Sequence, residues 1–240
     1  MRSRHELVWL TPLGWAQARA QAAPSPNEPP TPAQRVLVAS VARWSDNDLP
    51  LVACRCEPTL SATQLRLGLP MPPDADGSKL RFAFTLEEKV VARTQAPITL
   101  AEAAQAAPAR WREPLQALLA DCTRTAAALP AREGHAPLLL RVFGSLAMQA
   151  LTGLDYLRPG SDLDLLLYPR SAAELRAGLV VLRRHAAVLP LDGEIVFPDG
   201  GAVAWREFDA AGINDRVLVK SGACVQLQPR AQLLASLGPA

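Results

Sequence analysis

Two aspartates inside an apolar run are the residues of this chain whose types and spacing could do chemistry. Asp162 and Asp164 stand one residue apart in the stretch GSDLDLLL, residues 160–167. In a strand, side chains two positions apart point the same way, so both carboxylates would project together with their Cα atoms about 6.5–7 Å apart. Such like charges repel unless a cation lies between them or one carboxylate is protonated. Oxygen ligands of this kind suit Mg²⁺ or Mn²⁺ with bound phosphates, so the pair predicts metal ligands.

A glycine and a serine upstream of this pair predict an anion site. Gly144 and Ser145 follow the apolar run PLLLRVF, which favours a buried strand, and precede an apolar-periodic helix over residues 146–154. Backbone N–H groups at a helix start bind anions, glycine allows close approach, and serine adds a hydroxyl donor. Together the two motifs would hold a metal-bound polyphosphate. The alternative is that Asp162 caps a turn and Asp164 is solvated at a sheet edge.

The order of these motifs resembles the nucleotidyltransferase superfamily of the polymerase-β type. A strand, Gly-Ser, a helix, a loop ending in Gly160-Ser161 and then Asp-Leu-Asp in an apolar strand are its signature, and the resemblance covers about residues 97–208. It implies that Asp162 and Asp164 bind the metal ions that bridge a triphosphate, and that pyrophosphate leaves. Two metals then neutralise the attacking and leaving oxygens of an in-line displacement.

The resemblance also implies a third carboxylate on a later strand. Glu194 is the favoured candidate, because Ile195, Val196 and Phe197 follow it and place it within a strand. Asp192, at the entrance of the same strand, stays open as the alternative. Asp199 is better explained by the turn PDGG.

Longer stretches resemble one branch, the phosphoribosyl-dephospho-CoA transferases of malonate decarboxylase, also called malonate decarboxylase holo-acyl-carrier-protein synthases. These stretches are RHELVWL, LRLGLPMPP, RVFGSLAMQALTGLDYLRPGSDLDLLL, DGEIVFPDGGAVAWREF and RVLVK. The resemblance implies 2′-(5″-triphosphoribosyl)-3′-dephospho-CoA as donor, a serine of the acyl-carrier subunit of malonate decarboxylase as acceptor, and Mg²⁺ or Mn²⁺ as cofactor. Alternatives are a nucleotidyltransferase that uses ATP with a small-molecule or protein acceptor, and a non-catalytic nucleotide-binding module.

Several polar residues around the motifs carry weaker expectations. Arg206 and Lys220 either contact the triphosphate or form ordinary salt bridges. Ser161 either orients Asp162, contacts phosphate or caps a turn. The pair Arg183-Arg184 reads as a solvated helix face, with contact to an acidic carrier protein as the alternative.

The pattern of strands and helices expected around these residues predicts an α+β protein of two modules. Residues 1–96 are expected to form a small, mostly β module with short helical pieces, a possible contact for the donor or the carrier protein. Residues 97–240 are expected to form the catalytic domain, a mixed sheet with flanking helices. Strands are predicted over residues 36–41, 51–56, 79–86, 137–143 and 161–169, hairpins over 193–208 and 216–228, and helices over 111–129, 171–188 and from the Thr99/Glu102 capping box onward.

Composition excludes several other classes of protein. The 240 residues carry a net charge of +2, and no basic block stands out, so binding to nucleic acid is not expected. No apolar run approaches the length of a membrane span, and the first residues lack the apolar core of a signal peptide, so a cytoplasmic location is expected. The four cysteines have no zinc-site spacing and are expected to be reduced thiols.

Overall fold

The computed structural model describes residues 3–25, 27, 29–55, 60–61, 63–74, 76–130, 138–222 and 224–238. The chain divides into two compact units, Met1–Ala96 and Pro97–Ala240. Both units combine a β-sheet with helices, which confirms the predicted α+β class.

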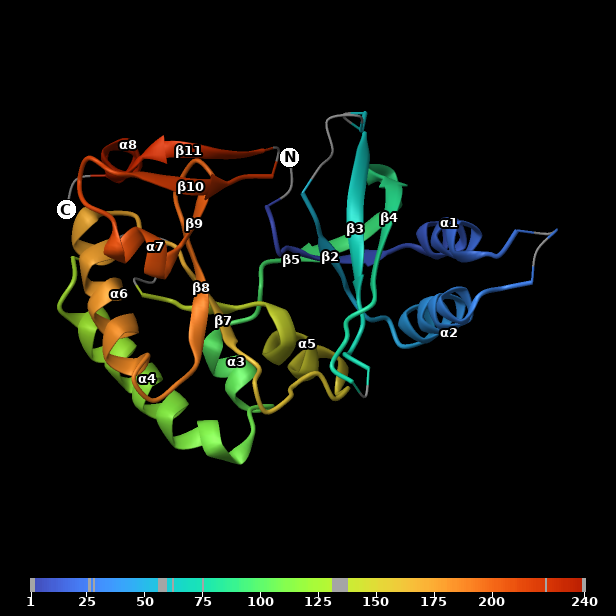
Figure 1. Ribbon diagram of the computed structural model, residues 1–240, viewed down its shortest axis with the longest axis horizontal. Helices are drawn as coiled ribbons and strands as arrows, with labels where there is room; N and C mark the ends of the chain where they lie inside the picture. The colour runs from blue at the N-terminus through green and yellow to red at the C-terminus, as the bar shows by residue number, and fades with distance from the viewer. Residues whose placement is uncertain are drawn as a thin grey trace. The chain divides into compact units, whose positions relative to one another are not determined.

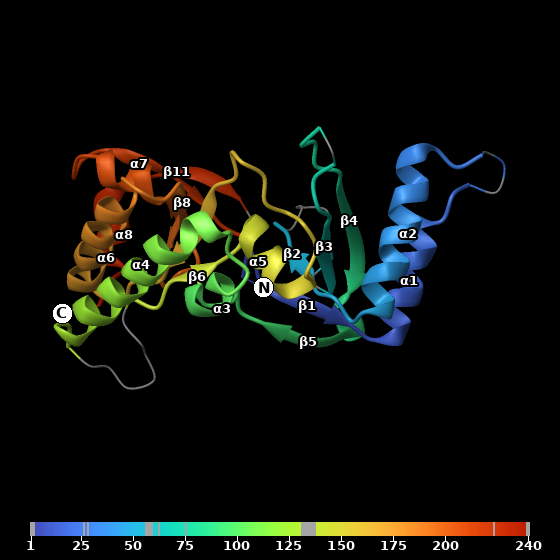
Figure 2. The same cartoon turned by 90° about the horizontal axis from the view of Figure 1, so that it is seen from below.

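The first unit contains a five-stranded antiparallel sheet in the order β4-β3-β2-β1-β5. In β3 every second residue is buried, as period-2 alternation requires of a strand with one face on a core. Two helices, α1 and α2, lie side by side in both views (Figures 1 and 2). The elements are β1 (Leu7–Leu10), α1 (Pro12–Ala22), α2 (Pro32–Asp46), β2 (Leu51–Ala53), β3 (Gln64–Pro70), β4 (Arg81–Glu87), η1 (Glu88–Val90) and β5 (Val91–Gln95).

The strand predicted over residues 36–41 is wrong, because this segment belongs to helix α2. Thr31 and Gln34 form a capping box, in which the Thr31 hydroxyl accepts from the Gln34 amide and the Gln34 side chain accepts from the Thr31 amide. Pro32 occupies the first turn, where a missing N–H costs nothing. Val41 and Trp44 lie three residues apart and are both buried, which is helical spacing. The unit is therefore less β-rich than predicted.

The second unit contains a six-stranded mixed sheet in the order β11-β10-β9-β8-β7-β6. Strands β7 and β8 are parallel, and the other described pairs of this sheet are antiparallel. The elements are α3 (Leu100–Ala104), α4 (Ala109–Ala127), β6 (Arg141–Val142), α5 (Gly144–Thr152), β7 (Leu163–Leu167), α6 (Ala172–His185), β8 (Leu191–Val196), β9 (Ala202–Ala204), α7 (Trp205–Ala210), β10 (Arg216–Lys220), β11 (Val225–Pro229) and α8 (Arg230–Ala235).

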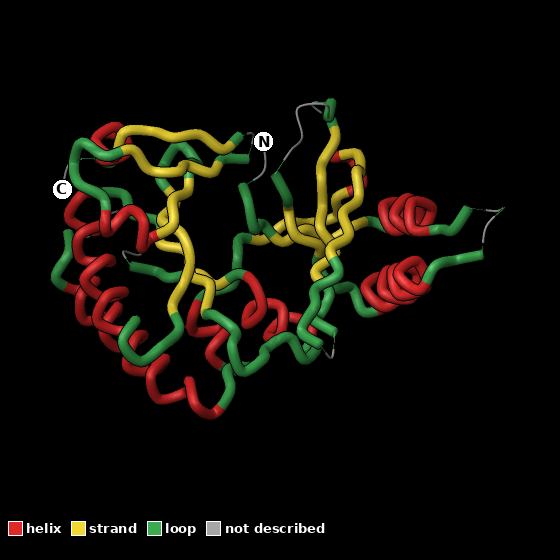
Figure 3. Tube along the Cα trace, in the orientation of Figure 1, coloured by secondary structure: helices red, strands yellow, loops and turns green. Residues whose placement is uncertain are grey.

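Several predicted boundaries in this unit need correction. Strand β6 is much shorter than the predicted run over residues 137–143, because Leu138 has a positive φ of 55° and Leu139 is 42% exposed; residue 137 lies outside the described residues. In the first unit, strand β2 likewise stops at Ala53, and the end of its predicted range, Cys56, is also outside the described residues. The predicted strand around AVAWREF gives way to helix α7 at Trp205 (Figure 3), whose buried Trp205 and Phe208 have helical spacing.

Other local predictions are confirmed. Thr99 and Glu102 form both halves of a capping box at the start of α3. The β10–β11 hairpin is present in continuous register. None of the helices in the described part of the chain is both long and apolar enough to span a bilayer.

Helix α6 fixes which side of β7 faces the core. A Cβ added at Gly178 of α6 would lie 2.6 Å from Leu167 Cδ2, so the helix packs tightly on that leucine. Leu163, Leu165 and Leu167 share this face and are at most 2% exposed. By strand alternation, Asp164 points to the opposite face.

Candidate active site

Asp164 lies directly against Gly144. A Cβ added at residue 144 would stand 2.1 Å from Asp164 Oδ2 and 3.0 Å from its Cγ. Gly144 also has φ +68°, a conformation that L side chains rarely adopt. The amide of Phe143 donates to the Asp164 carbonyl at 3.1 Å, which fixes the two segments to each other. The structure thus brings together the Gly-Ser pair and the second aspartate.

Helix α5 begins at this contact. Its N-cap residue, Phe143, is extended and supplies no side-chain acceptor to the first turn. The first N–H groups of a helix need acceptors and carry partial positive charge, which favours an anion there. Ser145, in this first turn, is 8% exposed. An acidic side chain and a helix start that favours an anion therefore lie at one corner of the sheet.

Asp162 precedes β7 rather than lying within it. The strand begins at Leu163, and Asp162 is exposed while Asp164 is partly buried. The strand predicted to include Asp162 therefore starts later than expected. The two carboxylates differ in environment, with one in solvent and one against the backbone of α5.

Strand β8 offers two acidic residues beside β7. In the parallel register, Asp164 pairs with Asp192 and Leu166 pairs with Glu194. Asp192 is exposed, whereas Glu194 is only 6% exposed and its Oε1 accepts a hydrogen bond from Lys220 Nζ at 3.1 Å. Across the described residues, no three His, Cys, Asp or Glu side chains are grouped to hold a metal ion. Asp162, Asp164 and Glu194 thus do not form a ready-made three-ligand cage.

Two family models match nearly the whole chain. Residues 99–231 match the model described as "Phosphoribosyl-dephospho-CoA transferase MdcG C-terminal domain", and residues 3–97 match the corresponding N-terminal domain. The chain belongs to the phosphoribosyl-dephospho-CoA transferase family. The predicted resemblance to the phosphoribosyl-dephospho-CoA transferases is confirmed, and the chain is a transferase.

Relatives of this transferase cover the same length. Proteins named phosphoribosyl-dephospho-CoA transferase from Xanthomonas campestris pv. campestris (strain 8004) and Xanthomonas euvesicatoria pv. vesicatoria (strain 85-10) are 36% and 37% identical, over 97% of both chains. One from Bradyrhizobium diazoefficiens is 36% identical over 97% of this chain and 92% of its own. No solved structure matches the chain.

The remaining predicted residues of the transferase have identifiable contacts. Ser161 Oγ accepts from the Arg158 amide at 2.8 Å, which is the turn-capping alternative. Arg206 donates to the Leu191 carbonyl at 3.0 Å, and its guanidinium carbon lies 4.5 Å from the centre of the Trp205 ring. Arg206 is thereby held at the start of β8, one residue from Asp192. Asp199 accepts from the Gly201 amide within the predicted turn.

Tyr168 is a residue of this region that the motifs did not indicate. Tyr168 directly follows the last residue of β7, four positions after Asp164 and two after Leu166. Burial raises the pKa of its hydroxyl, Arg141 lowers that pKa, and the charge of Glu194 raises it further, so Tyr168 lies within electrostatic reach of both residues. The alternation from Asp162 through Asp164 and Leu166 is the sequence signal that points to it.

Proposed function

We propose that this transferase moves the phosphoribosyl-dephospho-CoA group of 2′-(5″-triphosphoribosyl)-3′-dephospho-CoA to a serine hydroxyl of the acyl-carrier subunit of malonate decarboxylase. The contact between Asp164 and Gly144 at the start of α5 is the observation that carries the proposal. It joins a carboxylate to an anion-binding helix start, as transfer from a triphosphate requires. The names of the family and of its relatives support the donor class.

We further propose that the second unit has a polymerase-β-like nucleotidyltransferase fold. Its support is the order of elements: β6, the Gly-Ser pair, α5, β7 antiparallel to β6, the crossover helix α6, and β8 parallel to β7. This order places the acidic residues of β7 and β8 at one edge of the sheet, because parallel strands begin at the same edge.

The proposed reaction is an in-line displacement at the phosphorus nearest the ribose. The serine oxygen forms a bond to that phosphorus, the bond to the bridging oxygen of the β-phosphate breaks, and pyrophosphate leaves with the electron pair. The proton of the hydroxyl passes to a carboxylate at the site or to water. The product is a phosphodiester.

The carboxylates of Asp162 and Asp164 fit an Mg²⁺ or Mn²⁺ ion that is also bound by the phosphates of the substrate. Mg²⁺ is commonly held by one or two carboxylates plus substrate phosphates, and Asp162 and Asp164 supply two carboxylates. When bound, the ion would neutralise charge on the triphosphate. For the third carboxylate we propose Asp192, because it is exposed and lies in register with Asp164, while Glu194 is buried and bonded to Lys220.

Intact-mass analysis of the apo carrier subunit tests this function. Incubation with the transferase, Mg²⁺ and the dephospho-CoA donor should add the mass of one prosthetic group, and Asp164→Asn should reduce the rate at least 100-fold. A parallel reaction with ATP as the only donor should leave the carrier unmodified. Labelling from ATP, or full activity of Asp164→Asn, would contradict the proposal.

A further inference from the structure

Helices α4 and α6 together carry a surface rich in arginine. Their acidic residues are Glu113, which is exposed, and Asp121 and Glu174, which are each only 4% exposed. Their arginines are all exposed, in a chain whose net charge is only +2: Arg110, Arg112, Arg124, Arg176, Arg183 and Arg184. Arg183 is paired with Asp209 of α7, whose carboxylate accepts from Arg183 Nε at 2.7 Å and Nη2 at 2.5 Å, so Arg183 adds less net charge than the other arginines. Because α4 and α6 pack against each other, the remaining exposed arginines still concentrate positive charge on this pair of helices.

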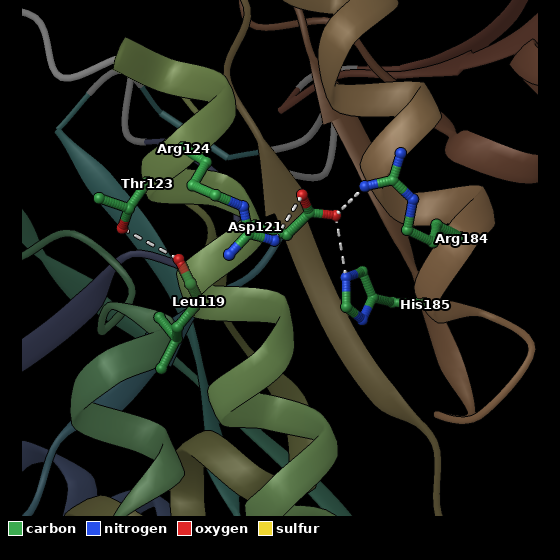
Figure 4. A network of polar contacts seen from close by, with 6 residues as sticks. All are labelled: Leu119, Asp121, Thr123, Arg124, Arg184 and His185. Atoms are coloured by element: carbon green, nitrogen blue, oxygen red, sulfur yellow. Dashed lines mark hydrogen bonds and ion pairs between the residues drawn. The ribbon is translucent and has the colours of Figure 1, made fainter.

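Two of these arginines converge on one buried carboxylate at the seam between the helices (Figure 4). Asp121 Oδ1 accepts from Arg124 Nη2 at 3.2 Å, and Asp121 Oδ2 accepts from Arg184 Nη1 at 2.6 Å and lies 3.1 Å from His185 Nε2. Arg124 and Arg184 nevertheless stay 69% and 60% exposed. Each guanidinium has five N–H donors, so each is anchored while most of its donors remain available. Anchoring lowers the entropy cost of binding an anionic group.

One end of this arginine-rich surface, the last turn of α6, lies at the edge of the sheet that bears the aspartates. Helix α6 connects the end of β7 to the start of the parallel strand β8, so its last turn, with Arg183 and Arg184, lies at the edge where both strands begin. The loop after the helix reaches the site directly, because the Pro190 carbonyl accepts from the amide of Leu163, the neighbour of Asp162 and Asp164.

Apolar side chains accompany the arginines. Val180, on the same stripe of α6 as Arg176 and Arg184, is 47% exposed, and Val188, in the loop toward the site, is 66% exposed. A partner that combines acidic side chains with an apolar stripe would match this surface in both charge and contact.

We propose that the surface formed by Arg124, Arg176, Arg183, Arg184, Val180 and Val188 docks an acidic, amphipathic face of the acceptor protein. This inference rests on the proposed function for the presence of a protein acceptor. Helix α6 covers the face of β7 opposite Asp164. An acceptor docked at the last turn of α6 therefore presents its hydroxyl to the donor around the edge of the sheet where β7 and β8 begin, which is the edge next to Asp162. The excess of positive charge selects an acidic acceptor over a basic one.

Direct binding of the apo acyl-carrier subunit of malonate decarboxylase, measured by calorimetry, tests the docking surface. The variants are Arg124→Gln, which leaves Asp121 paired with Arg184 and His185, and Val188→Glu, which adds a repelling charge without removing an anchored side chain. We expect the double variant to weaken carrier binding at least tenfold, and binding to wild type to weaken as salt rises. The affinity for the donor should change less than twofold.

Arg170→Glu is the matched control, because Arg170 is an exposed arginine that precedes α6 at the opposite end of the same helix. It makes the same total change of charge as the double variant, which loses one positive charge and gains one negative charge, and carrier binding should stay within twofold of wild type. Equal carrier binding by wild type and the double variant would overturn the inference. So would a double variant that loses affinity for the donor while it keeps its affinity for the carrier. An absence of carrier binding by wild type would overturn the inference as well. Wild type that binds the carrier but does not modify it would instead overturn the proposed function.

Discussion

The carboxylate of Asp164 occupies the space that a side chain at residue 144 would need. The glycine is required both for its φ of +68° and for the close approach of Asp164 Oδ2. The start of α5 and the aspartate of β7 are therefore fitted to each other, and a change at one should be felt at the other.

Gly144→Ala should disable the site with a modest loss of stability. The added methyl must push the Asp164 carboxylate away, and a misplacement of about 1 Å at a reacting centre can cost on the order of 100-fold in rate. The unfavourable φ costs about 1–3 kcal/mol. Transfer rate by intact mass and unfolding by denaturant measure the two effects.

Gly153→Ala is the control for Gly144→Ala. Gly153 ends the same helix with φ +69°, but a Cβ there meets nothing within 4 Å. We expect a similar loss of stability and a transfer rate within threefold of wild type. Equal rate losses in the two variants would show that backbone strain, rather than the Asp164 contact, explains the effect.

Asp192→Asn and Glu194→Gln should have opposite consequences. Asp192 is exposed and in register with Asp164, so its amide variant should lose transfer activity while its melting temperature hardly changes. Glu194 is buried and bonded to Lys220, so Glu194→Gln should cost about 1.5–3 kcal/mol of stability through the lost charged hydrogen bond. Metal-dependent rates and thermal melts separate the two. Loss of metal dependence in Glu194→Gln alone would instead identify Glu194 as the third carboxylate.

Acid should weaken the contact between α4 and α6. Burial by itself raises the pKa of Asp121, but hydrogen bonds from His185 and Arg184 and the charges of Arg184 and Arg124 outweigh it, so the pKa lies below its ordinary value of 3.8. A group whose pKa is lowered by folding stabilises the fold above its unfolded pKa, and this contribution is lost as the pH falls through the folded pKa.

Melting temperatures between pH 6 and pH 2 measure this loss. Wild type should lose stability below about pH 4, close to the pKa of an unperturbed aspartate. Asp121→Asn should begin less stable at pH 6 and fall less steeply below pH 4. Parallel curves for the two proteins would mean that other carboxylates govern acid unfolding.

Cys122 and Cys224 should differ sharply in reactivity. Burial raises the pKa of the Cys122 thiol to about 12, with a further rise from the charge of Asp121, whereas Cys224 is exposed. Since the thiolate is the nucleophile, alkylation at pH 7.5 should modify Cys224 well before Cys122. Peptide mass mapping over a time course measures the order. Faster labelling of Cys122 would indicate that the α4–α6 packing opens in solution.

Local sequence determined the features that depend on residues a few positions apart. The alternation of Asp162 and Asp164 with leucines, the Gly144-Ser145 pair and the capping box of Thr99 all follow from contacts within one or two turns. The start of α2 can also be predicted from local sequence, since Thr31, Pro32 and Gln34 form a helix-start signal. The valines that follow nevertheless favour a strand.

Tertiary structure alone decided which distant residues meet. The register of β8 against β7, which sets Asp192 rather than Glu194 opposite Asp164, depends on pairing between segments separated by a helix. The bond from Lys220 to Glu194 and the convergence of Arg124 and Arg184 on Asp121 also join positions far apart in the chain. In sequence these arginines are scattered and form no basic block, and only the packing of α4 on α6 gathers their charges.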